Sequence, residues 1–253
     1  MKQLYSTIFY QPIYNLLIWL YGLLGGNIGL AIVALTVVIK LILYPFSKQA
    51  IKSQKSLQEI QPKINELKEK YKDNKEAMTK AMMELYRQEK VNPFSSCLPL
   101  LVQFPFLIAV FQVFRNGLNS GGLDLLYPFI ANPSHIDPVW LSLDLSQPVW
   151  LLGVLAAAAQ YWQTKMLSHK QSPIKTPGAK DENMAATMNK QMLYFMPGLT
   201  VVFGFSLPGG LMLYWLVNTL LTVLQQYLVF RHKPLNQTNN AAIKWIKKFT
   251  GLY

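Results

Sequence analysis

Five long apolar runs limit what this chain can fold into. They cover residues 27–46, 95–114, 148–167, 191–207 and 210–230. A helix that crosses a bilayer needs about 20 mostly apolar residues, and the runs are close to that length. Only 14% of the residues are charged, whereas soluble domains carry about 25% charged residues. The sequence therefore predicts an all-α polytopic membrane protein with five transmembrane helices.

The segments outside these runs are expected to lie on or beyond the membrane surface. Residues 1–26 are apolar, but Gln11, Pro12 and Asn15 interrupt them, and no small-x-small cleavage pattern precedes Gly25. We expect an N-terminal interfacial helix there, partly amphipathic, rather than a signal peptide. The other segments are predicted to be a cytoplasmic helical hairpin at 47–92, an extracytoplasmic loop at 115–147, a cytoplasmic loop at 168–190 and a basic cytoplasmic tail at 231–253.

Two further patterns concern turns. Only the brief Leu207-Pro208-Gly209-Gly210 sequence separates the last two apolar runs, which predicts a tight helical hairpin. Within 47–92, apolar residues recur at helical spacing on both sides of Asp73-Asn74-Lys75. Two antiparallel helices, about 48–71 and 75–90, are predicted, and Pro62 should kink or break the first. A solvated linker with helical bias is the alternative for this segment.

Lysine and arginine are unevenly distributed, and this predicts the orientation of the chain. Segment 47–92 holds eleven of the 24 basic residues, whereas 117–147 holds none and 1–26 holds only Lys2. Because basic loops stay on the cytoplasmic side, we expect the N-terminus outside and the C-terminus inside. Topogenesis and attraction to anionic lipid explain such a distribution. Binding to ribosomal RNA is a further role that the charge leaves open.

Polar residues within the predicted spans gather in the cytoplasmic halves. Lys40 stands in the apolar sequence VVIKLILYPF, where a charge costs about 2.5–3.5 kcal/mol on insertion scales. The other polar positions at this depth are Thr36, Gln103, Gln160, Gln163, Asn218 and Thr222. Because the outer halves are apolar, the pattern predicts a wet groove that is open to the cytoplasm and closed towards the outside. Snorkelling of Lys40 to the interface is the alternative.

The counter-ion of Lys40 is not in the spans. All twelve Asp and Glu residues and all three histidines lie in the loops. A proton-coupled pump would normally need an intramembrane Asp, Glu or His. A small channel or transporter is the competing hypothesis, but it needs a continuous polar path. Cys97 is the only cysteine, which excludes a cysteine metal cluster. We expect no cofactor, no metal and no enzymatic activity.

Three segments resemble the YidC/Oxa/Alb family of membrane protein insertases. They are TVVIKLILYP, with a basic residue five positions before the proline; QPKINELKEKYKDNKEAMTKAMMELYRQEKVNPFSSCLPLLVQFP; and LPGGLMLYWLVNTLLTVLQQYLV. The resemblance covers about residues 8–231. It implies a nucleotide-independent insertase and chaperone of the bacterial cytoplasmic membrane, with a groove that receives nascent membrane proteins and releases them laterally into the lipid bilayer.

The resemblance also implies residues and partners. The groove would be centred on Lys40, and Trp215 would join the polar positions given above. Family members usually carry arginine where this chain has Lys40, and lysine is a point charge without the bidentate fork. The implied partners are nascent substrates, the ribosome through the hairpin and the basic tail, and the Sec translocon. A non-catalytic assembly factor that acts through the hairpin is the remaining alternative.

Overall fold

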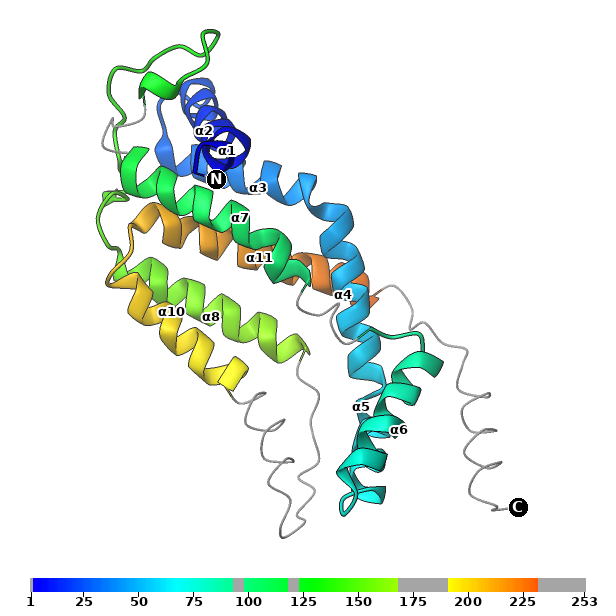
Figure 1. The fold of residues 1–253 in the computed structure, drawn as a ribbon. Coiled ribbons are helices and arrows are strands. Elements are labelled where there is room, and N and C mark those ends of the chain that lie inside the picture. The colour runs from blue at the N-terminus through cyan, green and yellow to red at the C-terminus, as the bar shows by residue number, and fades with distance from the viewer. Residues whose placement is uncertain (1, 93–97, 118–122, 168–190, 232–253) are drawn as a thin grey trace.

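The fold is a bundle of helices with a helical hairpin at one end. The computed structural model describes residues 2–92, 98–117, 123–167 and 191–231. Helices α3, α7, α8, α10 and α11 run side by side (Figure 1). Their bounds are Ile28–Ile42, Leu98–Gln112, Trp150–Leu167, Met196–Gly204 and Gly209–Arg231. The predicted loop 168–190 and the tail beyond Arg231 lie outside the described residues.

Helix α11 lies at the centre of the bundle. It packs against α3 and α8, and α10 packs against the other side of α8. The predicted tight hairpin of the last two runs is therefore only partly correct, because α10 and α11 pack mainly on α8 rather than on each other. The turn between them is held at the start of α8, where Gly209 N donates to Gln147 O at 2.8 Å and Pro208 bridges Pro148.

Helices α8 and α10 approach each other through glycine. A Cβ on Gly153 would lie 2.6 Å from the Cα of Gly204, and the reverse distance would be 2.7 Å. Small residues that let two backbones come this close are typical of helix packing in membranes. A short π-helix, Gln191–Phe195, leads into α10, and another, Val113–Gly117, extends α7.

The first predicted span ends earlier than expected. Helix α3 stops at Ile42, and α4 (Tyr44–Glu59) leaves it at an angle of 70°, so 27–46 is not one straight helix. Pro45 is the physical reason. It has no amide hydrogen for the carbonyl four residues earlier, and its ring disfavours the helical region for the residue before it. The bend directs α4 across the ends of α7 and α11 towards α5 (Figure 1).

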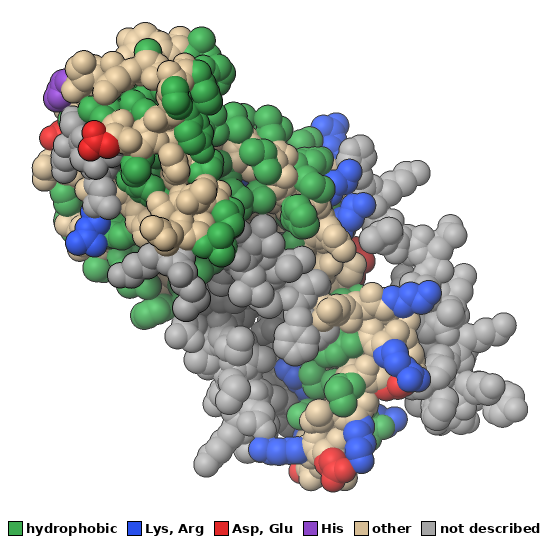
Figure 2. All heavy atoms as spheres, turned by 45° about the horizontal axis from the view of Figure 1, so that its top comes forward, with side chains coloured by type: hydrophobic (Ala, Val, Ile, Leu, Met, Phe, Trp, Pro, Cys, Tyr) green, Lys and Arg blue, Asp and Glu red, His purple; other side chains and the backbone are tan. Residues whose placement is uncertain are grey.

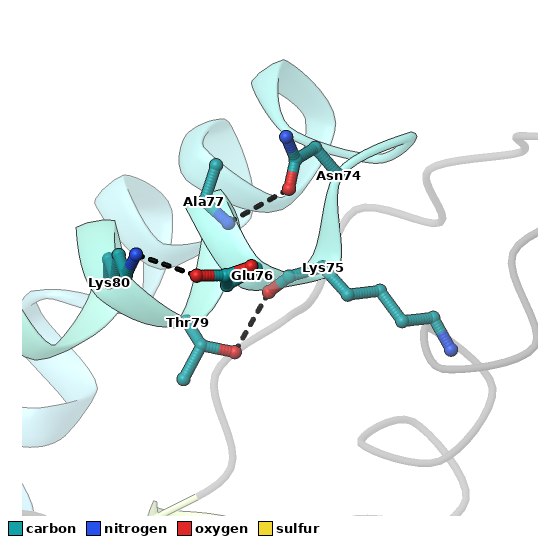
Figure 3. Close-up of polar contacts among 6 residues, drawn as sticks. All are labelled: Asn74, Lys75, Glu76, Ala77, Thr79 and Lys80. Carbon is teal, nitrogen blue, oxygen red and sulfur yellow. Dashed lines mark hydrogen bonds and ion pairs between the residues drawn. The ribbon is translucent and has the colours of Figure 1, made fainter.

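Two antiparallel helices follow α4 and lie beyond the end of the bundle. They are α5 (Gln61–Lys70), which begins one residue before Pro62, and α6 (Lys75–Gln88). An ion pair of 2.5 Å between Lys63 Nζ and Glu89 Oε1 joins their open ends. At the closed end, the Asn74 side chain caps α6 by accepting from Ala77 N at 3.0 Å (Figure 3).

The surface is divided by residue type. Hydrophobic side chains cover much of the bundle, whereas lysine and arginine gather towards α4, α5 and α6 (Figure 2). Within α6, Lys80 Nζ pairs with Glu76 Oε1 at 2.6 Å, one turn apart (Figure 3). Such exposed pairs on one helix stabilise it by about 0.3–0.5 kcal/mol. The hairpin is therefore held by its cap, its apolar seam and one partly buried ion pair.

The N-terminal helices contribute to the core. They are α1 (Lys2–Tyr5), the π-helix η1 (Ser6–Tyr10) and α2 (Gln11–Leu23). Tyr14 and Leu17 of α2 are almost fully buried, and α2 packs against α3. Asn15 Nδ2 donates to Leu125 O at 2.9 Å, and its Oδ1 accepts from Tyr127 N at 2.6 Å. The segment that was predicted to lie at an interface is therefore also a support for the loop 123–130.

The predicted extracytoplasmic loop, 115–147, contains strands that the all-α prediction missed. After the 3-10 turn Leu123–Leu125, strands β1 (Val139–Trp140) and β2 (Leu143–Asp144) form a two-stranded antiparallel hairpin. Trp140 lies against the start of α3 at Gly29, where a Cβ would come within 2.1 Å of the indole. Packing of this indole on the bundle stabilises a hairpin that would be marginal in isolation.

Length and composition identify few membrane-spanning helices in the described residues. Helix α11 is long and apolar enough to cross a membrane by itself. The bent pair α3–α4 is a second such segment if the two helices count as one span. Shorter apolar helices occur at Gln103–Arg115 and Leu193–Gly204. The buried core joins α2, α3, α7, α8 and α11, with Ile28, Ile32, Leu35 and Met212 fully inaccessible.

Candidate functional site

The Lys40 side chain joins α3 to α11. Its Nζ donates to Thr222 Oγ1 at 2.7 Å and to Asn218 Oδ1 at 3.3 Å. The Thr222 hydroxyl in turn donates to the backbone carbonyl of Asn218 at 2.7 Å. With its hydrogen used in this way, the hydroxyl presents lone pairs to the ammonium group. Lys40 is in the last turn of α3, where a cation also opposes the partial negative charge of the helix end.

The charge of Lys40 is not neutralised within the described residues. The ion pairs found there join other residues, and no carboxylate pairs with Lys40. An ammonium group has three donors, and two are satisfied by Asn218 and Thr222. The side chain is half-buried. It is thus a fixed, partly desolvated cation that can still accept a negatively charged partner.

A second polar contact lies on the same face of α11. Gln103 Nε2 of α7 donates to the Tyr214 hydroxyl at 2.5 Å. Tyr214, Asn218 and Thr222 are spaced four residues apart and so lie one above another on one helix face, over about 12 Å of helical rise. These three residues, with Lys40 and Gln103, are called the polar ladder below. It brings α3, α7 and α11 together through side-chain hydrogen bonds.

The other predicted groove residues have different surroundings. Thr36 is buried, and its hydroxyl donates to Ile32 O at 2.7 Å within α3. Trp215 packs on Phe203 of α10, with ring centroids 6.4 Å apart. Thr36 and Trp215 therefore make none of the ladder's hydrogen bonds.

The two glutamines of α8 also lie apart from the ladder. Gln160 Oε1 accepts from the Thr200 hydroxyl of α10 at 2.6 Å. This hydrogen bond fixes α8 to α10, in addition to the Gly153–Gly204 contact. Gln163 is half-buried on α8, three residues further along. Of the predicted groove residues, Lys40, Asn218 and Thr222 are brought into direct contact, and Gln103 bonds Tyr214, one turn before Asn218 on the same face of α11.

Sequence reasoning missed Tyr214 and Thr200 and left Gln226 outside the predicted site. Tyr214 was passed over because tyrosine counts as apolar in a hydropathy window, although its position four residues before Asn218 was a usable signal. Thr200 is 2% exposed and was hidden in a short apolar run. Gln226 is 1% exposed, and its Oε1 has no hydrogen-bond partner in the described residues. No group of three or more His, Cys, Asp or Glu that could hold a metal ion occurs in the described ranges.

Comparison with known proteins identifies the family. The family model described as "60Kd inner membrane protein" matches residues 19–237. A membrane protein insertase YidC from Fusobacterium nucleatum is 34% identical over 206 residues, which are 81% of this chain and 87% of that protein. The chain belongs to the YidC family of membrane protein insertases. The resemblance predicted from the sequence is thereby confirmed.

Other YidC proteins are longer. The YidC insertase of Geobacter sulfurreducens is 34% identical over 207 residues, but the chain spans only 34% of its length. A crystal structure of an active YidC insertase with the first transmembrane domain resolved superposes with a TM-score of 0.57 and 28% identity, covering 90% of this chain and 47% of that one. The chain thus spans about a third of the Geobacter insertase and about half of the crystallised one.

Proposed function

We propose that this YidC family member inserts nascent membrane proteins by receiving them in a cytoplasm-facing hydrophilic groove lined by the polar ladder. The observation that carries the proposal is the environment of the Lys40 ammonium group. This cation is held inside an apolar bundle by Asn218 and Thr222, and no carboxylate neutralises it in the described residues. An ionisable side chain within an apolar bundle that has hydrogen-bond partners but no opposite charge in the described residues is a functional hypothesis by default.

The groove would attract the hydrophilic tail of the substrate and shorten the path of that tail across the bilayer, without covalent chemistry. Opposite charges attract far more strongly in a partly dehydrated site than in water, because the effective dielectric constant is lower. An acidic residue in the translocated tail of a substrate would thus be drawn to Lys40. The hydroxyl and amide groups of Thr222, Asn218 and Gln103 would replace part of the tail's hydration. The apolar segment of the substrate would then leave sideways into lipid.

The apolar packing beyond the ladder supports a groove rather than a channel. A Cβ on Gly210, four residues before Tyr214, would meet Phe114 Cδ1 at 3.0 Å and Ile32 Cδ1 at 3.3 Å. Phe114 and Ile32 are buried there. A continuous polar path through α3, α7 and α11, which a channel needs, would have to cross this layer.

We further propose the predicted membrane topology. Five spans would place the N-terminus outside and the C-terminus inside the bacterial cytoplasmic membrane, with α5 and α6 in the cytoplasm. The uneven distribution of lysine and arginine supports this orientation. Helix α10 is short, and α3 ends at the bend. Both features are consistent with a locally thin bilayer, because a short apolar helix is accommodated by thinning of the lipid around it. The basic hairpin and tail would meet the ribosome, and the Sec translocon would be a further partner.

The test is insertion of a short substrate with an acidic translocated tail into proteoliposomes that contain only this protein. Three variants are compared: the native chain, Lys40→Arg and Lys40→Leu. We expect insertion with lysine and arginine and a large loss with leucine. Lys52→Leu is the matched control, because Lys52 is an exposed lysine on α4 and should leave insertion unchanged. Equal insertion by all three Lys40 variants would overturn the role of the charge.

A further inference from the structure

A β-hairpin turn presents a bulky apolar side chain to the outside of the molecule. Strands β1 and β2 pair in the register Trp140 with Leu143, so the turn consists of Leu141 and Ser142. Both have positive φ, 49° and 64°. Two-residue turns of this kind favour Asn and Gly, and a leucine with positive φ is strained. Leu141 is nevertheless 74% exposed. Strain of this kind persists only where the surrounding structure enforces it, and it is a reason to look for a functional role at that residue.

The base of this hairpin is fixed, so its tip is held in place. Trp140 and Leu143 pack against the core, and Trp140 covers Gly29. Leu145 N donates to Pro138 O at 3.0 Å and closes the base. Val139 lies on the opposite face of the strand from Trp140 and is 51% exposed. The hairpin thus carries one face anchored on the bundle and one exposed edge on which Val139 and Leu141 are apolar, with Asp144 opposite Val139.

The hairpin lies at the end of the bundle where several helices begin or end. Trp140 contacts the first turn of α3 at Gly29, and Gly210 N at the start of α11 donates to Leu145 O at 2.9 Å. Exposed aromatic residues flank the same end: Trp150 opens α8 and Phe205 follows α10. Aromatic side chains at the ends of apolar helices are typical of the membrane–water interface. The exposed edge of the hairpin continues this set of interfacial side chains.

We propose that the β1–β2 turn inserts Leu141, with Val139, into the boundary between headgroups and acyl chains of the adjacent lipid leaflet. The charged residues around the turn indicate how it would contact the lipid. Residues 123–149 hold Asp124, Asp137 and Asp144 but no lysine or arginine. Attraction to an anionic surface is therefore absent, and the insertion depends on apolar burial. This inference rests on the proposed placement of the bundle in a membrane, and it adds an anchor on the side opposite the basic hairpin.

The experiment uses the full chain in lipid nanodiscs with Cys97, the only cysteine, replaced by serine. An environment-sensitive fluorophore is attached at Leu141→Cys and compared with Leu155→Cys on the exposed face of α8 and Asp73→Cys at the turn before α6. Lipids with a quencher near the headgroup should quench the 141 probe at least about twofold more than the 73 probe. This difference should be the same at low and high salt, and in zwitterionic and anionic lipid.

The outcomes separate this inference from the proposed function. Quenching at 155 but not at 141 would overturn the lipid anchor and leave the membrane placement intact. An absence of quenching at 155 would overturn both. Quenching at 141 that disappears at high salt would show an electrostatic contact and contradict the apolar insertion.

A second variant separates lipid contact from folding of the turn. With the probe at Val139→Cys, Leu141→Asn should lower the quenching by lipid about twofold, because the apolar tip is removed. Asparagine favours positive φ, so the hairpin itself should be retained and the thermal midpoint should not fall. Unchanged quenching in the Leu141→Asn chain would show that Leu141 is not the anchor.

Discussion

Lys40 and Thr222 lie on different helices, 182 positions apart, and are joined by a hydrogen bond of 2.7 Å. The ammonium group donates this hydrogen bond, and the Thr222 hydroxyl donates its own hydrogen bond to the backbone carbonyl of Asn218. This pairing holds the cation near α11 rather than letting it extend along its own helix. The lysine is thus positioned by side chains of the bundle, which argues against simple snorkelling to the interface.

Thr222→Val should destabilise the protein and weaken the positioning of Lys40. The variant keeps the volume of the side chain but removes the acceptor, and an unsatisfied partly buried donor costs about 1–3 kcal/mol. We expect a lower thermal midpoint in detergent and slower insertion of acidic-tailed substrates. Thr222→Ser keeps the hydroxyl and serves as the control. An unchanged midpoint in the valine variant would show that Lys40 finds another acceptor.

Gly153→Ala should destabilise the contact between α8 and α10. The added Cβ would meet the backbone of Gly204 at 2.6 Å, and backbone cannot yield as a flexible side chain does. Overpacking of this kind typically costs about 1–3 kcal/mol. Thermal unfolding in detergent would measure the loss.

The matched control for that substitution is Gly198→Ala in α10. A Cβ at Gly198 meets no atom within 4 Å, and alanine in a helix interior is favoured over glycine by about 1 kcal/mol. The two changes are chemically identical, but they should change the stability in opposite directions, because only the Cβ at position 153 would meet another backbone. Equal effects would show that the Gly153–Gly204 approach is not a close packing contact.

Asn74→Ala should fray the start of α6. The side chain accepts from Ala77 N at 3.0 Å (Figure 3), and loss of such an N-cap costs about 0.5–2 kcal/mol. We expect faster amide hydrogen exchange in the first turn of α6 and little change in the bundle. Asn74→Asp should retain protection, because aspartate caps a helix equally well. Identical exchange in the alanine variant would argue that the turn, rather than the cap, fixes the helix.

Asn15→Leu should release the loop 123–130 from α2. The amide of Asn15 donates to Leu125 O and accepts from Tyr127 N, and leucine has a similar branched shape, with a larger volume, but lacks these groups. Leu125 O keeps its hydrogen bond from Gln11, whereas Tyr127 N loses its acceptor, and an unpaired, partly buried backbone group costs about 1–3 kcal/mol. We expect faster hydrogen exchange at Tyr127 N and a lower thermal midpoint. Gln11, which also donates to Leu125 O at 3.1 Å, provides the control, because Gln11→Leu should affect one bond only.

The sequence alone determined the family, the helical class and the residue types of the site. Local patterns predicted the apolar runs of near-membrane length, the turn at Asp73-Asn74-Lys75 and the lysine within an apolar run. The spacing of Asn218 and Thr222 also placed them on one helix face. These features depend only on residues close together in the chain, so periodicity and turn chemistry suffice to find them.

Only the tertiary structure decided which polar groups meet. Gln160 bonds Thr200 rather than a ladder residue, Tyr214 enters the ladder through Gln103, and α8 lies between α10 and α11. Periodicity gives the face of a helix, but the rotation and neighbour of each helix depend on how all the helices pack together. The hairpin at Leu141 likewise depends on contacts between distant segments, because Trp140 packs on the start of α3. The bend after α3 differs, because Pro45 is a local cause.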